Sequence, residues 1–184
     1  MHESGPDGGE KRSRWLRAVD SFRRRSRAVE PGSGDGVSPQ GTAQVAYKRM
    51  VNEFISPTVR GWGLTGSAGR YVLPSDGVWA LVGLQKSVYS DVHSIRFTVN
   101  LLVVSKAIWA ERRPDDASRG RLPSPNMLYG SWAENERLGM LVHGGTDEWW
   151  RLGALDDPAA VAKDVLGALR SHGLPWLQQR IKQH

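Results

Sequence analysis

Two long apolar stretches joined by a short polar loop dominate the middle of the sequence, over residues 79–106. In the second stretch apolar side chains recur at every other position, the period of a β-strand with one fully apolar face (Ile95, Phe97, Val99, Leu101 and Val103). The first stretch, Trp79–Lys86, is apolar on both sides until its last two residues, as in a central strand. Ser90 and Asp91 between the two favour a turn. We therefore expect a β-hairpin inside a larger sheet, because a lone hairpin is marginal in water.

A helical pattern precedes this hairpin. Thr42 is a suitable N-cap, and apolar residues follow it at helical spacing (Tyr47, Met50, Val51, Phe54 and Ile55). Pro57 is expected to bend or restart the helix, because proline lacks the backbone N–H and crowds the preceding turn. The helix is expected to end near Gly61.

A second helical pattern closes the chain. Asp157 followed by Pro158 predicts a capped helix start, and apolar residues at helical spacing follow (Val161, Val165, Leu166 and Leu169). Gly173 is expected to stop this helix as a glycine C-cap, before a short last helix over residues 175–182.

Three shorter segments complete the predicted sheet: Arg70–Pro74, Arg137–Val142 and Glu148–Leu152. A long polar insertion, Arg112–Pro125, is predicted to be a surface loop. The strands are consecutive and their links are short, which favours antiparallel pairing. The sequence therefore predicts an α+β domain, with a mainly antiparallel sheet of about five strands and the N- and C-terminal helices packed on one face.

Positive charge is concentrated near the N-terminus. Residues 11–27 carry eight Lys or Arg and one Asp, whereas residues 28–184 carry 17 basic and 15 acidic groups. We interpret residues 1–41 as a disordered basic tail with a Pro/Gly/Ser linker, and residues 42–184 as a single domain. Apolar residues at helical spacing in the tail (Trp15, Leu16, Val19 and Phe22) leave a second interpretation open, in which residues 11–27 form a basic helix that contacts nucleic acid or an anionic membrane surface.

The chain contains no cysteine, which excludes a disulfide framework, a thiolate metal site and a cysteine nucleophile. A chain without cysteine fits a reducing compartment. The apolar runs are far shorter than the ~20 residues needed to span a bilayer, and no apolar segment of a secretory signal is visible at the N-terminus. We therefore expect a cytoplasmic protein.

Several short motifs occur in a fixed order: LVGLQKS, FTVNLLV, RLG, DEWWRL and HGLPWLQQ. Together with the opening helix they resemble the bacterial domain-of-unknown-function family 4304, over roughly residues 42–182 with an interruption at residues 112–125. The positions that carry the resemblance are Gln85, Lys86, Ser87, Phe97, Asn100, Leu138, Trp149, Trp150, Leu174, Pro175 and Trp176. The resemblance implies no established reaction, so it bears on boundaries and fold rather than on function.

The end of the first central strand is a candidate ligand site, because functional residues often lie where strands end. Gln85 offers a donor and an acceptor, Lys86 a charge, and Ser87 a hydroxyl. With Arg96 and Asn100 from the second strand, these side chains would suit a small phosphate or carboxylate ligand. The alternative is an ordinary strand end with a solvated lysine.

No catalytic template is present: the chain has no GxSxG, GxxxxGK[ST] or HExxH sequence. Asp91 and His93 lie on one predicted turn, and His143 and Asp147 flank another, but without the spacing typical of a metal site. We predict no metal and no cofactor. Enzymatic activity stays open, and the sequence favours a protein without it.

Adjacent indoles at Trp149 and Trp150 are the clearest sign of a binding surface. On a strand, one of the two must face away from the core. Tryptophan is enriched at interfaces, although a helix or loop could equally cover the outward ring. The leading prediction is therefore a non-catalytic binding or protein-interaction domain whose partner is another protein. The alternatives are a small anionic ligand near Gln85–Ser87, and binding through the tail.

Overall fold

The structure is a computed structural model of the chain, and it describes residues 42–112, 122–142 and 144–184. The described residues form one compact unit. The predicted tail and linker at residues 1–41 lie outside the described residues, as do His143 and most of the predicted surface loop, residues 113–121. Among the helices that are described, none has both the length and the apolar character needed to cross a bilayer.

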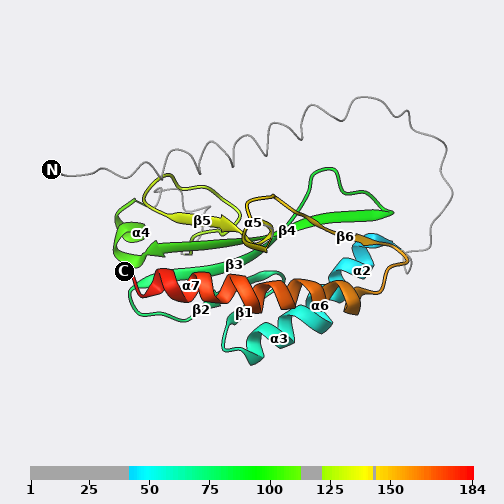
Figure 1. Cartoon of the computed structure of the whole chain (residues 1–184), viewed down its shortest axis with the longest axis horizontal. Coiled ribbons are helices and arrows are strands. Elements are labelled where there is room, and N and C mark those ends of the chain that lie inside the picture. The colour runs from blue at the N-terminus through cyan, green and yellow to red at the C-terminus, as the bar shows by residue number, and fades with distance from the viewer. Residues whose placement is uncertain (1–41, 113–121, 143) are drawn as a thin grey trace. The chain divides into compact units, whose positions relative to one another are not determined.

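The six-stranded antiparallel sheet has the order β1-β2-β3-β4-β5, and β6 lies beside β4 as well (Figure 1). The strands are β1 (Thr65–Ser67), β2 (Arg70–Leu73), β3 (Val78–Lys86), β4 (Ser94–Ser105), β5 (Glu134–Arg137) and β6 (Trp150–Gly153). The predicted central hairpin is β3 and β4, which pair from Val78 opposite Ser105 to Lys86 opposite Phe97. The sheet is thus built around this pair, as the apolar patterning predicted.

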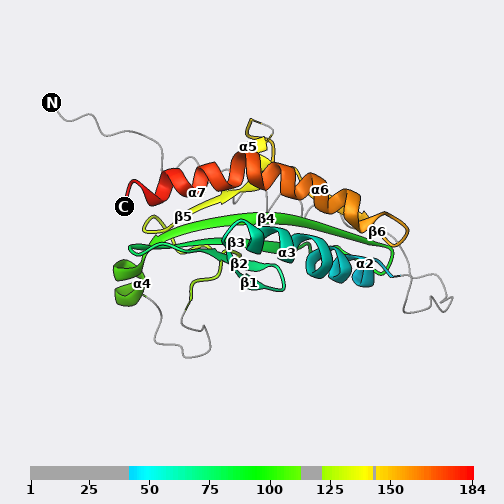
Figure 2. The same ribbon diagram turned by 90° about the horizontal axis from the view of Figure 1, so that it is seen from below.

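Helices cover one sheet face along its length. The N-terminal group is α2 (Ala43–Arg49), η2 (Met50–Ile55) and α3 (Ser56–Gly61), and the C-terminal group is α6 (Pro158–Ala168), η4 (Leu169–Gly173) and α7 (Leu174–Ile181). Both groups pack against the apolar face of β4. A smaller helix, α4 (Lys106–Arg112), lies on the other side of the sheet from α6 and α7 (Figure 2), where Trp109 packs with Leu81 and Leu102. The α+β prediction is confirmed.

Each helical group contains a π-helical turn just before a proline. η2 precedes α3, which has Pro57 in its first turn, and Ile55 and Ser56 before it keep helical φ and ψ, so the helix continues past the proline through a π-helical turn. The predicted helix stop at Gly173 is wrong, because Gly173 has a helical φ of −69° and the chain continues through η4 into α7. A Cβ at Gly173 would lie 2.6 Å from Leu169 Cδ1 and 3.2 Å from Leu138 Cδ1. This glycine therefore permits close packing rather than ending the helix.

The predicted strand over Arg137–Val142 is also wrong. β5 ends at Arg137, and the following residues form a short helix, α5 (Leu138–Val142). Its apolar residues at positions 138, 141 and 142 are spaced as i, i+3 and i+4, so a run this short fits a helix as well as a strand. A Cβ at Gly139 would lie 2.2 Å from the Glu148 backbone oxygen, so the missing side chain lets the returning chain pass directly against α5.

Candidate functional site

The sheet has a break along one side of β4. β5 pairs with β4 from Asn100 to Val103, and β6 pairs with it from Ser94 to Phe97. Between these two pairings, at positions 98 and 99, β4 has a strand neighbour only on the β3 side. The chain that joins β5 to β6 leaves the sheet there through α5. Polar side chains gather at this break, on the sheet face opposite the helices.

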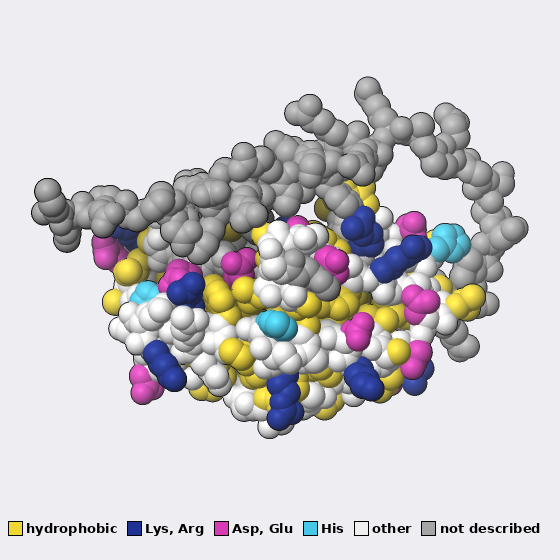
Figure 3. All heavy atoms as spheres, in the orientation of Figure 1, with side chains coloured by type: hydrophobic (Ala, Val, Ile, Leu, Met, Phe, Trp, Pro, Cys, Tyr) yellow, Lys and Arg dark blue, Asp and Glu magenta, His cyan; other side chains and the backbone are white. Residues whose placement is uncertain are grey.

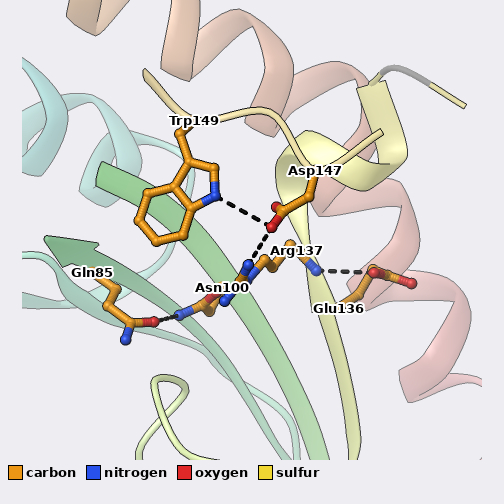
Figure 4. Close-up of polar contacts among 6 residues, drawn as sticks. All are labelled: Gln85, Asn100, Glu136, Arg137, Asp147 and Trp149. Carbon is orange, nitrogen blue, oxygen red and sulfur yellow. Dashed lines mark hydrogen bonds and ion pairs between the residues drawn. The ribbon is translucent and has the colours of Figure 1, made fainter. Parts of the chain in front are cut away.

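Arg137 is the most deeply buried charge at the break. Its side chain is 4% exposed, and Nη1 donates a hydrogen bond to Oδ2 of Asp147, whose side chain is 16% exposed. The indole Nε1 of Trp149 donates to the same oxygen over 3.2 Å (Figure 4), and the guanidinium lies 5.1 Å from the centre of that ring. The Asp147 carboxylate therefore orients both partners. Such a pair is expected where a guanidinium is buried, because leaving its charge uncompensated is costly.

A chain of three side-chain amides lies beside this ion pair. Asn126 Nδ2 donates to the Leu84 backbone oxygen (3.2 Å), which fixes Asn126 Oδ1 as an acceptor. Asn100 Nδ2 donates both to that Oδ1 (2.9 Å) and to Gln85 Oε1 (2.7 Å; Figure 4). Both N–H groups of Asn100 are thereby used. The opposite orientation of the amide would place Asn100 Oδ1 against two acceptor oxygens, so the hydrogen bonds select this one.

Three buried oxygen atoms at the break receive no hydrogen bond from any described residue. They are Thr98 Oγ1, Asn100 Oδ1 and Asp147 Oδ1. Thr98 is fully buried, and Asn100 is 4% exposed. Buried polar atoms are nearly always paired with protein or ordered water, so these oxygens mark a place where a hydrogen-bond donor fits.

The structure brings together two of the five predicted ligand residues, Gln85 and Asn100, which are directly hydrogen-bonded. Lys86 follows Gln85 along β3 and points to the helix-covered face. Its Nζ donates to Gln44 Oε1 of α2 over 3.0 Å and lies 5.6 Å from the centre of the Tyr47 ring. The lysine charge is therefore separated from the two amides by the sheet.

Ser87 begins the hairpin loop, and Arg96 lies near the start of β4. The Ser87 backbone N–H donates to the Arg96 carbonyl over 2.7 Å, while Ser87 Oγ accepts from the Tyr89 N–H over 3.2 Å. Arg96 is half-buried and lies opposite Arg151 of β6, on the same sheet face as Thr98. The Ser87 hydroxyl thus contributes to the turn.

Trp149 and Trp150 lie on different sides of the sheet. Trp150 pairs in register with Phe97, and the two rings stack with centres 6.2 Å apart in the helix-side core. Trp149 precedes the strand and contacts Arg137 and Asp147 at the break. Both indoles are half-buried, and their role in binding a partner stays a prediction.

The acidic and histidine residues considered as metal ligands have other roles where they are described. Asp91 Oδ1 accepts hydrogen bonds from the backbone N–H groups of Ser94 and His93, both at 2.8 Å, and these bonds lower the pKa of Asp91 below its ordinary value. Asp147 is paired with Arg137, and His143 lies outside the described residues. Within residues 42–112, 122–142 and 144–184, no group of three or more His, Asp or Glu is arranged to hold a metal ion.

A second surface feature lies at the open end of the β3–β4 hairpin. Backbone hydrogen bonds of 2.9 Å join this loop to the start of α2 (Ala43 N–H to the Val92 oxygen) and to the β6–α6 connection (Ala154 N–H to the His93 oxygen). We call the large exposed apolar side chains of these three segments the hairpin-end surface: Val45 (41% exposed), Val88 (90%), Tyr89 (39%), Val92 (51%) and Leu155 (98%).

The helical face differs from the hairpin-end surface. Hydrophobic side chains form a band over α6 and α7 in Figure 3, with charged groups around it. The large apolar residues of these two helices are nevertheless buried or half-buried. The band therefore belongs to the packing of the helices on the sheet.

Three residues at the break were not considered as ligands from the sequence, namely Thr98, Asn126 and Arg137, and Asp147 was considered only as a metal ligand. Thr98 carried a usable signal, because it shares with Asn100 the polar positions on one face of the most regular strand. Arg137 and Asp147 lie ten residues apart in separate motifs. Only the turn of the chain through α5 brings them together, and no local pattern encodes that turn.

The observed architecture defines a class, the α+β domains with an antiparallel sheet and one helical layer. The family model described as Domain of unknown function (DUF4304) matches residues 55–179, and the chain belongs to this family. This match confirms the resemblance seen in the sequence motifs. No curated protein and no solved structure matches the chain at a significant level.

Proposed function

We propose that the protein is a cytoplasmic, non-catalytic binding domain that recognises another protein through the hairpin-end surface. The observation that carries this proposal is the gathering of large, exposed apolar side chains on three neighbouring segments, with Val88 at 90% and Leu155 at 98% exposure. Exposed apolar side chains that cluster, rather than occurring singly, mark sites of protein interaction.

The loop that carries this surface is held in place by local hydrogen bonds. Asp91 accepts from two backbone N–H groups, and Ser90 Oγ both donates to the Arg96 carbonyl and receives the Arg96 N–H, each at 3.1 Å. A preformed loop loses less conformational entropy on binding than a flexible one. The apolar side chains are therefore presented on a fixed backbone.

The rival prediction of a small anionic ligand near Gln85–Ser87 has less support from the geometry. Its positive charge, Lys86, is directed towards α2, and the hydroxyl of Ser87 caps a turn. A stable interface buries about 800 Å² on each partner. The hairpin-end surface would supply the apolar centre of such an interface, and the polar residues around it would supply the rim.

The test is recovery of a partner by affinity purification with the double variant Val88→Ser/Leu155→Ser. Both side chains are almost fully exposed, so the variant should unfold at the same denaturant concentration as the parent protein while losing the partner. Leu128→Ser is the matched control, because Leu128 is 38% exposed on a different loop. Recovery of the same partner in equal amount by the double variant would refute the proposal.

A further inference from the structure

The break beside β4 contains a polar site with an unusual balance of hydrogen-bonding groups. Asn100 has both N–H groups bonded to amide oxygens, and its own oxygen is left buried without a donor from the described residues. Thr98 Oγ1, on the same face two residues earlier on β4, is likewise buried without a hydrogen-bond donor from the described residues. Asp147 Oδ1, on the segment between α5 and β6, is the third such oxygen.

The Arg137–Asp147 pair at this site has no net charge. The guanidinium of Arg137 is bonded to Asp147, and the half-buried Trp149 covers its face. An anion would meet a cation already neutralised by a carboxylate, together with three oxygen atoms whose lone pairs repel it. A hydroxyl group meets neither obstacle, because it donates to one oxygen and accepts from another.

The site also has an aromatic wall. The Trp149 indole is fixed by its hydrogen bond to Asp147 and by its contact with Arg137, so the ring is positioned before any ligand arrives (Figure 4). Small-molecule sites combine such an apolar surface with a few placed polar groups. Gln85, Asp147 and Trp149 are half-buried, so three of the side chains at the break are partly exposed to solvent, whereas the three oxygens are buried.

From this arrangement we propose that the break in the sheet binds a small neutral molecule rich in hydroxyl groups, a polyol or a sugar. Its hydroxyls donate to Thr98 Oγ1, Asn100 Oδ1 and Asp147 Oδ1, and its C–H face packs against Trp149. This site is separate from the hairpin-end surface and does not depend on the proposed protein partner.

The indole N–H signal of Trp149 in nitrogen-15 NMR spectra provides the test. The chain has eight tryptophans, so Trp149→Phe assigns the signal by its loss. Glycerol, myo-inositol, glucose and galactose serve as the hydroxyl probes, and inorganic phosphate and acetate as the anionic ones. NMR is preferred to melting curves, because polyols stabilise folded proteins without binding at a site. We expect a saturable shift with at least one hydroxyl probe and none with the anions.

Thr98→Val removes one hydroxyl and keeps the side-chain shape. It should weaken the binding about tenfold, the usual effect of one lost hydrogen bond, without lowering stability. Thr98→Ser should restore the binding, and Thr65→Val, on the exposed strand β1, should leave it unchanged. If the valine variant does not fold, the binding affinities of Thr98→Ala and Thr98→Ser are compared instead, because these two variants also differ by one hydroxyl. No saturable shift, as expected if ordered water alone fills the break, would overturn the proposal. So would a stronger response to phosphate, or equal binding by both Thr98 variants.

Discussion

Replacing Gly139 by alanine tests whether close backbone packing holds the break together. The new Cβ would lie 2.2 Å from the Glu148 oxygen and 2.9 Å from its nitrogen, whereas real Cβ atoms essentially never approach closer than 3.0 Å. Both contacts are with backbone, so no side chain can rotate away. One way to relieve the clash is to strain the local packing, which lowers the free energy of unfolding by about 1–3 kcal/mol. The other is to move the chain off α5 and break the Arg137–Asp147 pair, which costs about 3–5 kcal/mol.

The protein is expected to adopt the less costly of these two responses. Gly139→Ala should therefore lower the free energy of unfolding by about 1–3 kcal/mol. Urea unfolding followed by circular dichroism measures this value. Gly167→Ala on helix α6 is the matched control, because nothing lies within 4 Å of the added Cβ. This substitution should raise the free energy of unfolding by about 0.5–1 kcal/mol, because alanine favours a helix over glycine. A Gly139→Ala protein as stable as its parent would refute the packing argument.

Three further predictions concern charge and ionisation. Asp147→Ala should lower the free energy of unfolding, measured in urea, by about 3 kcal/mol, because it leaves the buried Arg137 charge without its partner. The double variant Arg137→Met/Asp147→Ala should recover most of that loss. Equal losses in the two variants would argue against a buried ion pair. Hydrogen bonds from the backbone N–H groups of Ser94 and His93 lower the pKa of Asp91 below its ordinary value of 3.8. The stability that this carboxylate contributes is therefore lost as the pH falls through a value below 3.8. The chemical shift of the Ser94 amide measured against pH reports this ionisation, and a midpoint at or above 3.8 would contradict the prediction. Burial, and then the neighbouring Tyr71, raise the pKa of Tyr47 above its ordinary value of 10.0. The unfolded chain therefore ionises first as pH rises past 10, and stability falls there; Tyr47→Phe should reduce the drop in unfolding free energy between pH 8 and pH 11, and an unchanged drop would count against the assignment.

The sheet and helical layer were predictable because their signals are long. β4 has one fully apolar face over its whole length, and the helix starts at Thr42 and Asp157 have caps that the structure confirms through bonds to Val45 and Ala159. Regular patterns of this length leave little choice of secondary structure. The errors fall where a pattern is short or where a glycine has two uses. Gly173 serves close packing inside a helix, although a glycine at that position is equally typical of a helix end.

The candidate site was predictable only in part, for a different reason. Gln85 and Asn100 could be identified because Gln85 lies near the end of one apolar strand and Asn100 interrupts the apolar pattern of the strand that pairs with it. Lys86 follows Gln85 directly, and adjacent residues on a strand point to opposite faces, so the two could not serve one ligand site on the sheet. The ion pair across the break depends on the path of the chain through α5, which is a tertiary feature without a local signature.

The break itself follows from a conflict between pairing and packing along β4. β5 and β6 pair antiparallel with the same side of β4 and run in the same direction, but residues 138–149 lie between them where only positions 98 and 99 remain unpaired, so the extra residues leave the sheet through α5. The helix instead places Leu138 in the core, and the return segment passes over Gly139. The polar side chains at the break lie beside the two positions of β4 that have no strand neighbour on this side. A site formed in this way needs few special residues, which explains why it has no motif of its own.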